Sequence, residues 1–421
     1  MAKFIIQGPN VLSGAVRVSG NKNSTFPLIA AALLADEPSK LTNVPNIIDV
    51  EVLVEILENL GVRIDWNKET SIMVINPSNL TKCEIDPELG GKLRGAIVLA
   101  ASLIVKFGKA EFPRPGGDPI GARPLGAHLS AMQAFGVNCD RDFSGVRLSV
   151  ESLKPANIFL EEASPTATEM AMITASGIAG ETVIEGAACE PHVVDLAEML
   201  VKMGAKIQGA GTNTIRINGA KKLQAVEHKV RPDHIEVGTF AIASAITGGQ
   251  VDIEDALPQD LKIILAYLSR MGVKYSWKKE TVLTIKPSRL KAEQGVFKTR
   301  TWPGFPTDMM SQFIVLATQS EGTVLCHDWM YESRMYFVDR LIKMGANIFL
   351  ADPHRVIVIG PSKLHGDLIP SADIRAGGAL VLAALVAEGE SVVEHAEVID
   401  RGYESFDQKL ASLGAKIRRG E

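Results

Sequence analysis

Six stretches of the chain share one order of apolar and polar positions. In each, an Ala-rich segment that is apolar on every side precedes a short alternating segment, and an amphipathic segment with helical spacing follows. Each amphipathic segment ends at a glycine, which can adopt the left-handed conformation of a helix C-cap. These glycines recur roughly every 70 residues, and they are Gly61, Gly136, Gly204, Gly272, Gly345 and Gly414. The pattern predicts six repeats of strand, buried helix, strand, amphipathic helix, strand.

The repeats predict an α/β fold in two domains of three repeats each. The 421 residues are about two to three times the length of a typical domain. One strand precedes the first buried helix at Lys22, and another precedes the fourth at Asp233. We therefore expect one domain over residues 22–231, with repeats 1–3, and a second over residues 1–21 plus 232–421, with repeats 4–6. A solenoid of six stacked repeats is the alternative, although no repeat has the polar composition of a cap.

The charge balance excludes two classes of function. With 44 Lys+Arg against 49 Asp+Glu, the formal net charge is −5 and no basic block stands out, so we expect no nucleic acid and no membrane as a partner. No apolar run reaches the roughly 18 residues of a spanning helix, and the N-terminus lacks the regions of a signal peptide. The four cysteines lie far apart, as reduced thiols do in cytosolic proteins. The sequence thus predicts a soluble, cytoplasmic protein.

Neither a metal site nor an ATP site is expected. The eight histidines form no HxxxH or HExxH arrangement, and no GxxxxGK[ST] segment occurs. These absences argue against a metallohydrolase and against an ATP-dependent ligase. We expect no metal and no cofactor.

Polar and charged residues recur where the chain enters the predicted helices. At the buried helices they are Lys22 with Asn23, Arg94, Ser164 with Thr166, Asp233 with His234, Asp308, and Asp373 with Arg375; at the amphipathic helices they are Asp118 with Arg123, His192, Arg334 and Arg401. Because these positions are equivalent by repeat, we expect them to cluster near helix N-termini, whose amides and dipoles favour anions. Arginine and lysine there suit a ligand with several phosphate or carboxylate groups. At any single position, an N-cap or a solvated charge is the alternative.

A loop rich in glycine and proline, RPGGDPIGARP over residues 114–124, is the other informative segment. Its composition precludes regular structure, and it is long enough to act as a lid. It holds one acid, Asp118, between two arginines. A surface turn is the alternative interpretation.

Five motifs give the chain a close resemblance to the enolpyruvyl transferases, in particular to the branch that acts on UDP-N-acetylglucosamine. They are SGNKN at Ser19, PGGDPIGARP in the loop, FPTD at Phe305, ADIRA at Ala372 and IDRGYE at Ile399, and the resemblance covers essentially the whole chain. It implies an inside-out α/β barrel of two domains, each with three repeats, rather than a solenoid. It also implies an active site in the cleft between the domains, with the loop of Asp118 as a lid on the domain of residues 22–231.

The resemblance also implies a reaction. The enolpyruvyl group of phosphoenolpyruvate would move to the 3-hydroxyl of UDP-N-acetylglucosamine with release of phosphate, which is the first committed step of peptidoglycan synthesis. Addition followed by elimination needs a base, an acid and charge stabilisation, and no metal. No obligate protein partner is expected. The alternatives are enolpyruvyl transfer to another uridine nucleotide or to shikimate 3-phosphate, and a catalytically silent paralogue that binds a sugar nucleotide.

Roles carried over from the family's motifs fall on the residues already singled out. Asp118 would be the acid and Asp308 the base. The remaining assignments are Lys22, Arg123 and Arg401 to the phosphate of phosphoenolpyruvate, Arg334 and Arg375 to its carboxylate or nearby charge, Asn23 and Arg94 to the sugar nucleotide, the stretch Arg123, Pro124 and Leu125 with Ser164 to uridine and diphosphate, Met330 to an apolar wall, and Asp373 to substrate binding. Lys22 and Arg401 also count as catalytic.

The chain departs from the family's usual pattern at four positions. Asp118 stands where most members have cysteine, and Trp302 stands where a histidine is frequent. Gly126 replaces an acidic residue and Glu162 replaces a lysine, both in the region of nucleotide recognition. These last two positions bear on which acceptor the protein uses.

Overall fold

The computed structural model describes residues 2–293 and 295–420, and these divide into two compact units. Unit 1 comprises Met1–Ser19, Asp118–Ala122 and Pro232–Glu421, and unit 2 comprises Gly20–Gly117 and Arg123–Arg231. The sequence analysis placed its boundaries at 21/22 and 231/232. The tip of the Asp118 loop is grouped with unit 1, although the sequence analysis assigned the whole loop to residues 22–231, because the tip makes its hydrogen bonds to residues of unit 1 (described below).

Unit 2 contains three sheets, with strand orders β13-β3-β5-β4, β6-β8-β7 and β11-β12-β10-β9. Its helices are α1 (Lys22–Ala32), α2 (Ile48–Leu60), η1 (Pro77–Asn79), α3 (Pro87–Lys92), η2 (Arg94–Val98), α4 (Leu99–Phe107), α5 (Gly126–Ala134), α6 (Pro165–Ser176) and α7 (Pro191–Met203). Its strands are β3 (Ser39–Thr42), β4 (Arg63–Asn67), β5 (Ile72–Asn76), β6 (Lys109–Pro113), β7 (Asn138–Arg141), β8 (Gly145–Ser149), β9 (Asn157–Phe159), β10 (Gly180–Glu185), β11 (Lys206–Gln208), β12 (Thr214–Gly219) and β13 (Glu227–Lys229).

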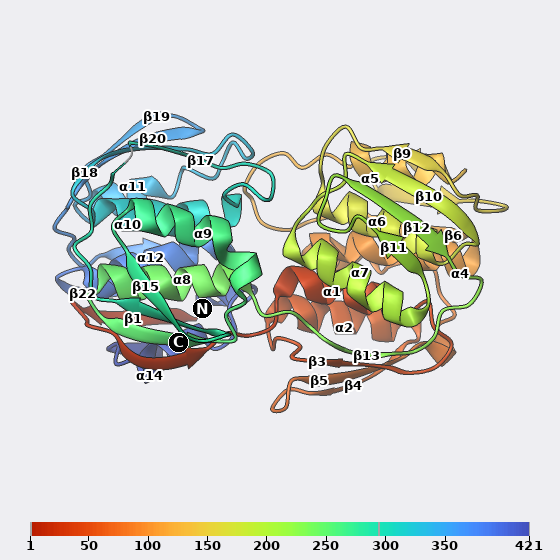
Figure 1. Cartoon of the computed structure of the whole chain (residues 1–421), viewed down its shortest axis with the longest axis horizontal. Helices are drawn as coiled ribbons and strands as arrows, with labels where there is room; N and C mark the ends of the chain where they lie inside the picture. The colour runs from red at the N-terminus through yellow and green to blue at the C-terminus, as the bar shows by residue number, and fades with distance from the viewer. Residues whose placement is uncertain (1, 294, 421) are drawn as a thin grey trace. The chain divides into compact units, whose positions relative to one another are not determined.

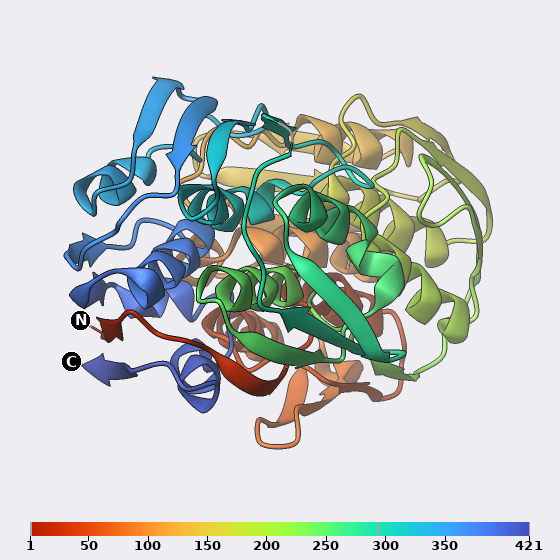
Figure 2. The ribbon, with the colours of Figure 1, turned by 60° about the vertical axis from the view of Figure 1, so that its left-hand side comes forward.

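Unit 1 also contains three sheets, with strand orders β21-β22-β1-β23, β15-β16-β14-β2 and β17-β18-β20-β19. Its helices are α8 (His234–Ile246), α9 (Pro258–Arg270), η3 (Thr307–Met309), α10 (Met310–Thr318), α11 (Val338–Lys343), α12 (Ile374–Val386), α13 (Ala396–Ile399) and α14 (Phe406–Ser412). Its strands are β1 (Lys3–Gly8), β2 (Ser13–Arg17), β14 (Gln250–Glu254), β15 (Lys274–Lys279), β16 (Val282–Lys286), β17 (Val296–Lys298), β18 (Gly322–His327), β19 (Ile348–Asp352), β20 (Arg355–Gly360), β21 (Leu368–Pro370), β22 (Gly389–Glu394) and β23 (Ile417–Gly420). Strands β1 and β23, near the two ends of the chain, pair side by side (Figures 1 and 2).

Within each unit the helices that are apolar all round lie at the centre and the sheets lie outside (Figure 1). Helices α8, α10 and α12 pack on one another in unit 1, as α1, α4 and α6 do in unit 2. Every residue of α10 is buried, which is what a helix without a polar face requires. The inside-out α/β architecture that the resemblance implied is confirmed, and the solenoid is wrong.

The repeat glycines also behave as the pattern predicted. All six have positive φ, from 80° at Gly272 to 116° at Gly204. Gly61 and Gly204 are left-handed C-caps of α2 and α7, and their amides donate to carbonyls of the last helical turn. The amphipathic helix of the sixth repeat, α14, begins only at Phe406, and Tyr403 lies in the turn before it.

Candidate active site

Three charged side chains from separate segments of unit 1 meet at Asp308. This residue lies on η3, whose first turn precedes the buried helix α10. Arg334 donates from Nη2 to Asp308 Oδ1 at 3.0 Å, and Arg375 donates from Nε to Oδ2 at 3.2 Å. The structure therefore brings together three of the residues that the repeats had marked as equivalent.

Both arginines of this cluster are buried, with Arg334 only 1% and Arg375 only 5% exposed. Burial by itself would lower the pKa of each guanidinium, but the surrounding acidic groups, Asp308 foremost, together outweigh it and raise the pKa of both arginines. A buried cation is stable only when it is paired. The two arginines and Asp308 thus depend on each other for their charged forms.

A second layer of polar residues supports this cluster, and the sequence analysis did not single it out. The Tyr403 ring lies 5.3 Å from the Arg375 guanidinium carbon, and its hydroxyl accepts from Gln312 Nε2 at 2.8 Å. Gln312 Nε2 also reaches the backbone oxygen of Arg375 at 3.4 Å. The signal was present, because Tyr403 belongs to the IDRGYE motif and Gln312 is a large polar residue in a largely apolar helix.

The turn that carries Asp308 is held from another direction by Asp328. This carboxylate is fully buried at the end of β18, accepts from Met330 N at 2.9 Å, and is hydrogen-bonded to the hydroxyl of Thr307. Met330, predicted as an apolar wall, is half-buried in the loop after that strand. Asp328 therefore links the backbone around Met330 to the residue next to Asp308.

Two predicted aspartates of unit 1 are N-caps. Asp373 Oδ1 accepts from the backbone of Arg375 at 2.9 Å and from Ala376 at 2.8 Å, and its carboxylate lies 3.9 Å from Arg334. Asp233 accepts likewise at the start of α8, where the neighbouring His234 packs edge-on against Trp302. Both aspartates thus fix a helix start beside the candidate site.

The tip of the Asp118 loop is fixed within unit 1. Arg401 Nη1 lies 3.4 Å from Asp118 Oδ1. The backbone of Ser333 donates to Ile120 at 3.1 Å, and the backbone of Ala122 donates to the Glu332 carboxylate at 3.2 Å. The predicted acid therefore lies beside a predicted phosphate ligand, and Glu332, which the sequence analysis did not consider, helps to hold the loop.

In unit 2 the predicted cations lie at helix starts. Lys22 Nζ is 2.6 Å from Asp49 Oδ2, and both side chains are largely buried. Arg94 begins η2 and donates from Nη2 to the Arg123 carbonyl at 2.5 Å. Gly117 has φ +114°, and a Cβ there would come within 2.8 Å of the Arg123 guanidinium. The positive φ favours glycine at this position.

The remaining predicted residues of unit 2 lie around α1, α5 and α6. Asn23 follows the cap of α1, where Asn21 Oδ1 accepts from its backbone at 2.8 Å. Ser164 caps α6 by accepting from the backbone of Ala167 at 3.4 Å. Pro124 is exposed before α5, and Leu125 is buried.

Two buried histidines complete this part of unit 2. Thr166 Oγ1 lies 2.7 Å from His128 Nε2, and burial, followed by the charge of Arg94, lowers the pKa of His128 to about 4. His192 lies on α7 with its Nε2 3.9 Å from Glu169. Burial raises the pKa of Glu169 well above its usual range. The neutral forms of His128 and Glu169 are therefore favoured.

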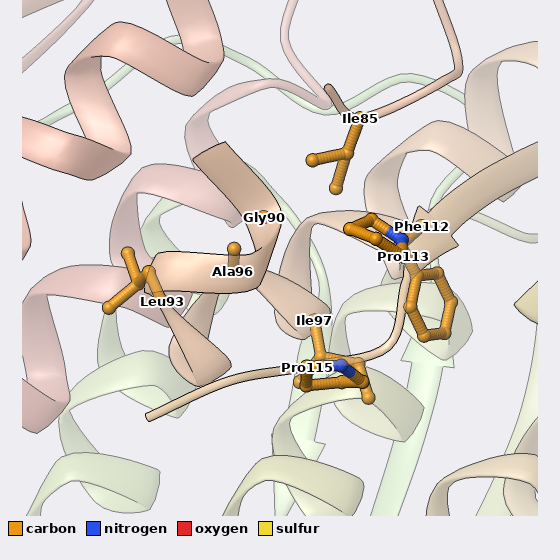
Figure 3. A pocket seen from close by; sticks show the side chains of 8 residues that line it. All are labelled: Ile85, Gly90, Leu93, Ala96, Ile97, Phe112, Pro113 and Pro115. Atoms are coloured by element: carbon orange, nitrogen blue, oxygen red, sulfur yellow. The ribbon is translucent and has the colours of Figure 1, made fainter. Parts of the chain in front are cut away.

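A small pocket in unit 2 lies under the start of the Asp118 loop (Figure 3). Its lining is apolar and consists of Ile85, Gly90, Leu93, Ala96, Ile97, Phe112, Pro113 and Pro115. Such a lining cannot pair with phosphate or carboxylate groups. The pocket therefore does not suit the polyanion that the charged residues predict.

Two features are absent from the described residues. No group of three or more His, Cys, Asp and Glu side chains within residues 2–293 and 295–420 is placed to hold a metal ion. Nor does any helix in the same ranges combine the length and the apolar character that crossing a membrane requires.

The chain is similar to known proteins over nearly its whole length. A family model described as EPSP synthase (3-phosphoshikimate 1-carboxyvinyltransferase) matches residues 6–410. The chain is 43% identical over 432 residues to the UDP-N-acetylglucosamine 1-carboxyvinyltransferase of Treponema denticola, and 43% identical over 419 residues to that of Halothermothrix orenii, with 100% of each chain covered in both cases.

Solved structures agree in fold. The enolpyruvyl transferase NikO from Streptomyces tendae superposes with a TM-score of 0.88 at 27% identity, covering 99% of this chain and 98% of that one. EPSP synthase from Acinetobacter baumannii gives a TM-score of 0.77 at 18% identity over 100% of both chains, a likeness of fold alone.

Proposed function

The chain belongs to the EPSP synthase family of 1-carboxyvinyl transferases, and we propose that it transfers the enolpyruvyl group of phosphoenolpyruvate to the 3-hydroxyl of UDP-N-acetylglucosamine and releases phosphate. Curated relatives named UDP-N-acetylglucosamine 1-carboxyvinyltransferase match the full length of the chain at 39% to 43% identity. The single observation of the site that carries the proposal is the carboxylate of Asp308 held by two buried arginines.

Asp308 serves as the base in this proposal. As the 3-hydroxyl oxygen bonds to C2 of phosphoenolpyruvate, the hydroxyl proton passes to the Asp308 carboxylate. Arg334 and Arg375 hold this carboxylate in one orientation, and they also offer guanidinium groups to the carboxylate of the substrate. The support is the pair of contacts at 3.0 and 3.2 Å.

Asp118 serves as the acid that delivers a proton to C3 of phosphoenolpyruvate. Proton gain at C3 and C2–O bond formation yield a tetrahedral adduct; loss of a proton from C3 and of the phosphate at C2 then restores the double bond. Lys22, Arg123 and Arg401 neutralise the departing phosphate. The position of Arg401 at 3.4 Å from Asp118 supports a shared role at the phosphate.

The sugar nucleotide is assigned to the helix starts of unit 2. Asn23 and Arg94 hold it together with Ser164, which lies at the start of α6, where the positive end of the helix dipole favours a diphosphate. Pro124, Leu125 and Met330 contribute apolar contacts, and Asp373 acts beside them. The proposed setting is the cytoplasm, at the first committed step of peptidoglycan synthesis.

Phosphate release measured with a panel of acceptors tests the proposal. UDP-N-acetylglucosamine should give turnover, while UMP, UDP-glucose and shikimate 3-phosphate should give little. Gly126 and Glu162 stand exposed in the region of nucleotide recognition, so turnover with another uridine nucleotide alone would move the assignment to that acceptor. Binding of the sugar nucleotide without phosphate release from any acceptor would indicate a silent paralogue.

The loop assignment has its own test with fosfomycin, an epoxide that alkylates the cysteine of family members. A carboxylate is a far weaker nucleophile than a thiolate towards an epoxide, so the wild-type protein should resist the drug. The Asp118→Cys variant should be inactivated over time and gain the mass of the drug on the new cysteine. Modification of wild-type Asp118, or an unmodified Cys variant, would contradict this role for the loop.

A further inference from the structure

An apolar row crosses the solvent side of one sheet of unit 1. Val296 of β17 pairs with Leu325 of β18, Leu325 pairs with Ile357 of β20, and Ile357 pairs with Phe349 of β19. Phe349 is 64% and Val296 is 51% exposed, while Leu325 and Ile357 are half-buried. Helices α10 and α11 cover the opposite side of this sheet (Figure 1). The four side chains therefore form one continuous apolar row that the described chain does not cover.

The internal repeats provide five matched controls for this row. In each of the other five sheets, the cross-strand row at the equivalent position contains at least one charged side chain. The rows contain Glu227, Lys40 and Asp65 with Val74 in the sheet of β3; Arg216 paired with Val183 in the sheet of β10; Asp252 paired with Thr284 in the sheet of β14; Glu111, Arg147 and Asp140 in the sheet of β6; and Arg418 paired with Ile5 in the sheet of β1. Each of those five rows has at least one charge, and the row of Val296 has none. The fold alone does not require an apolar row, because five copies of the same unit manage without one.

Positive charge borders the apolar row two residues further along the strands. There Lys298 pairs with His327, and His327 pairs with Arg355. Burial, followed by the charges of Lys298 and Arg355, lowers the pKa of His327. Arg355 is bound to Asp352 at 2.5 Å, whereas Lys298 is exposed and makes no ion pair with residues 2–293 or 295–420. The border of the row is therefore positively charged, and Lys298 is its exposed cation.

We propose that this row is a docking surface for an acidic amphipathic helix of a partner protein, with the apolar face of the helix on Val296, Ile357 and Phe349 and its carboxylates beside Lys298. Three strand spacings make the row about 14 Å long, which matches about nine helical residues. Apolar side chains at i, i+4 and i+7 would span it. Carboxylates on one flank of that helix would face the basic border, and a lysine flank would be repelled.

The test uses three fluorescein-labelled helical peptides and the full chain, and it needs no catalytic activity. The first peptide has Leu at i, i+4 and i+7 with Glu along one flank, the second has Lys in place of Glu, and the third has Ser in place of Leu. Fluorescence anisotropy should show the Glu peptide binding at least tenfold more tightly than either of the others. Equal binding of the Glu and Lys peptides, or no binding of the Glu peptide at 1 mM, would overturn the proposal.

Matched variants locate the binding. Phe349→Ser and Val296→Ser should each weaken binding of the Glu peptide at least fivefold. Lys298→Glu should weaken binding of the Glu peptide and strengthen binding of the Lys peptide. Leu368→Ser is the control, because Leu368 is 60% exposed at the position of β21 that corresponds to Val296 in β17. An equal loss in the control would overturn the proposal, as would unchanged binding in Phe349→Ser. Phosphate release should be normal in all four variants.

Two further experiments distinguish the acidic helix from two other occupants of the row. Sedimentation of the chain alone at 1–100 μM should show no self-association through the row. Self-association of the wild type that Phe349→Ser abolishes would assign the row to a second copy. Vesicles of phosphatidylglycerol should not retain the wild-type protein; retention lost in Phe349→Ser would assign it to a lipid surface. Either result would overturn the assignment to an acidic helix.

Discussion

The buried helices of the two units begin with different caps. In unit 2, α1 and α6 are capped by the neutral side chains of Asn21 and Ser164. In unit 1, α8 and α12 are capped by the carboxylates of Asp233 and Asp373. Each carboxylate accepts hydrogen bonds from two backbone amides. The folding units are repeats of one design, so this difference concerns electrostatics rather than architecture.

A neutral cap leaves the positive end of the helix dipole to act on a ligand, whereas a carboxylate cap largely cancels it. Unit 2 therefore attracts anions at its helix starts, and Lys22 and Arg94 add to this effect. Unit 1 needs cations to accept an anion at all, and Arg334 and Arg375 supply them around Asp308. In the proposed function, unit 2 receives the polyanion and unit 1 keeps a carboxylate in place with arginines.

Removing the charge of Asp308 should break this arrangement with the largest effect. Asp308→Asn keeps the shape but removes basicity, so turnover should fall by roughly 10²–10⁴, while binding of UDP-N-acetylglucosamine to unit 2 stays within about threefold. Phosphate release and calorimetric binding measure the two quantities. Asp339→Asn, at an exposed aspartate of α11, is the control. Near-normal turnover would reassign Asp308 to a structural role.

The burial of His128 beside Arg94 should appear in the pH dependence of stability. His128 has a folded pKa of about 4 against an ordinary 6.5, so between these values the unfolded chain binds a proton that the native chain does not. Stability is therefore fully present above pH 6.5 and is lost as the pH falls, by about 2 kcal/mol at pH 5.

His128→Gln should remove this loss. Urea unfolding at pH 5 and pH 7.5 measures it, and His365→Gln, at an exposed histidine of unit 1, is the control. If wild type and His128→Gln lose the same stability between the two pH values, the pKa of His128 is not lowered by its burial beside Arg94.

Exchanging a cap should make unit 2 resemble unit 1. Ser164→Asp keeps an acceptor for the backbone of Ala167 but adds a negative charge, so the affinity for UDP-N-acetylglucosamine should fall about tenfold, which is within the free energy of a charge at a helix terminus. Titration calorimetry measures the change. Asn76→Asp, which alters the cap of η1 in the same unit, should leave the affinity unchanged. Unchanged affinity in Ser164→Asp would place the diphosphate elsewhere.

The smallest effect should come from the second layer of unit 1. Tyr403→Phe removes the hydroxyl that accepts from Gln312 and lies 3.1 Å from the Thr239 hydroxyl, while keeping the ring over Arg375, so kcat should fall about 2- to 10-fold, as expected when these hydrogen bonds are lost. KM for the nucleotide should not change, because the contact lies in unit 1. Tyr336→Phe, at an exposed tyrosine, is the control. An effect on KM alone would argue against a positioning role.

Much of the fold could be predicted because the features involved are local. The helix-ending glycines and the buried helices follow from residue spacing within single repeats, and their φ values and burial confirm them. Much of the candidate site could also be named, since the residues entering each helix are equivalent by repeat. Asp328, Gln312, Tyr403 and Glu332 were not found, because a buried polar partner or a loop contact has no periodic pattern.

What the sequence by itself determined is the repeated unit and the chemical character of its helix starts, because hydrophobic periodicity and capping act over a few residues. What only the tertiary structure decided is which charges meet. Arg375 reaches Asp308 across 67 residues and Arg334 across 26, and the Tyr403 hydroxyl approaches Thr239 across 164. Such contacts depend on how buried helices pack, since a few ångströms of displacement would leave a buried guanidinium without its carboxylate.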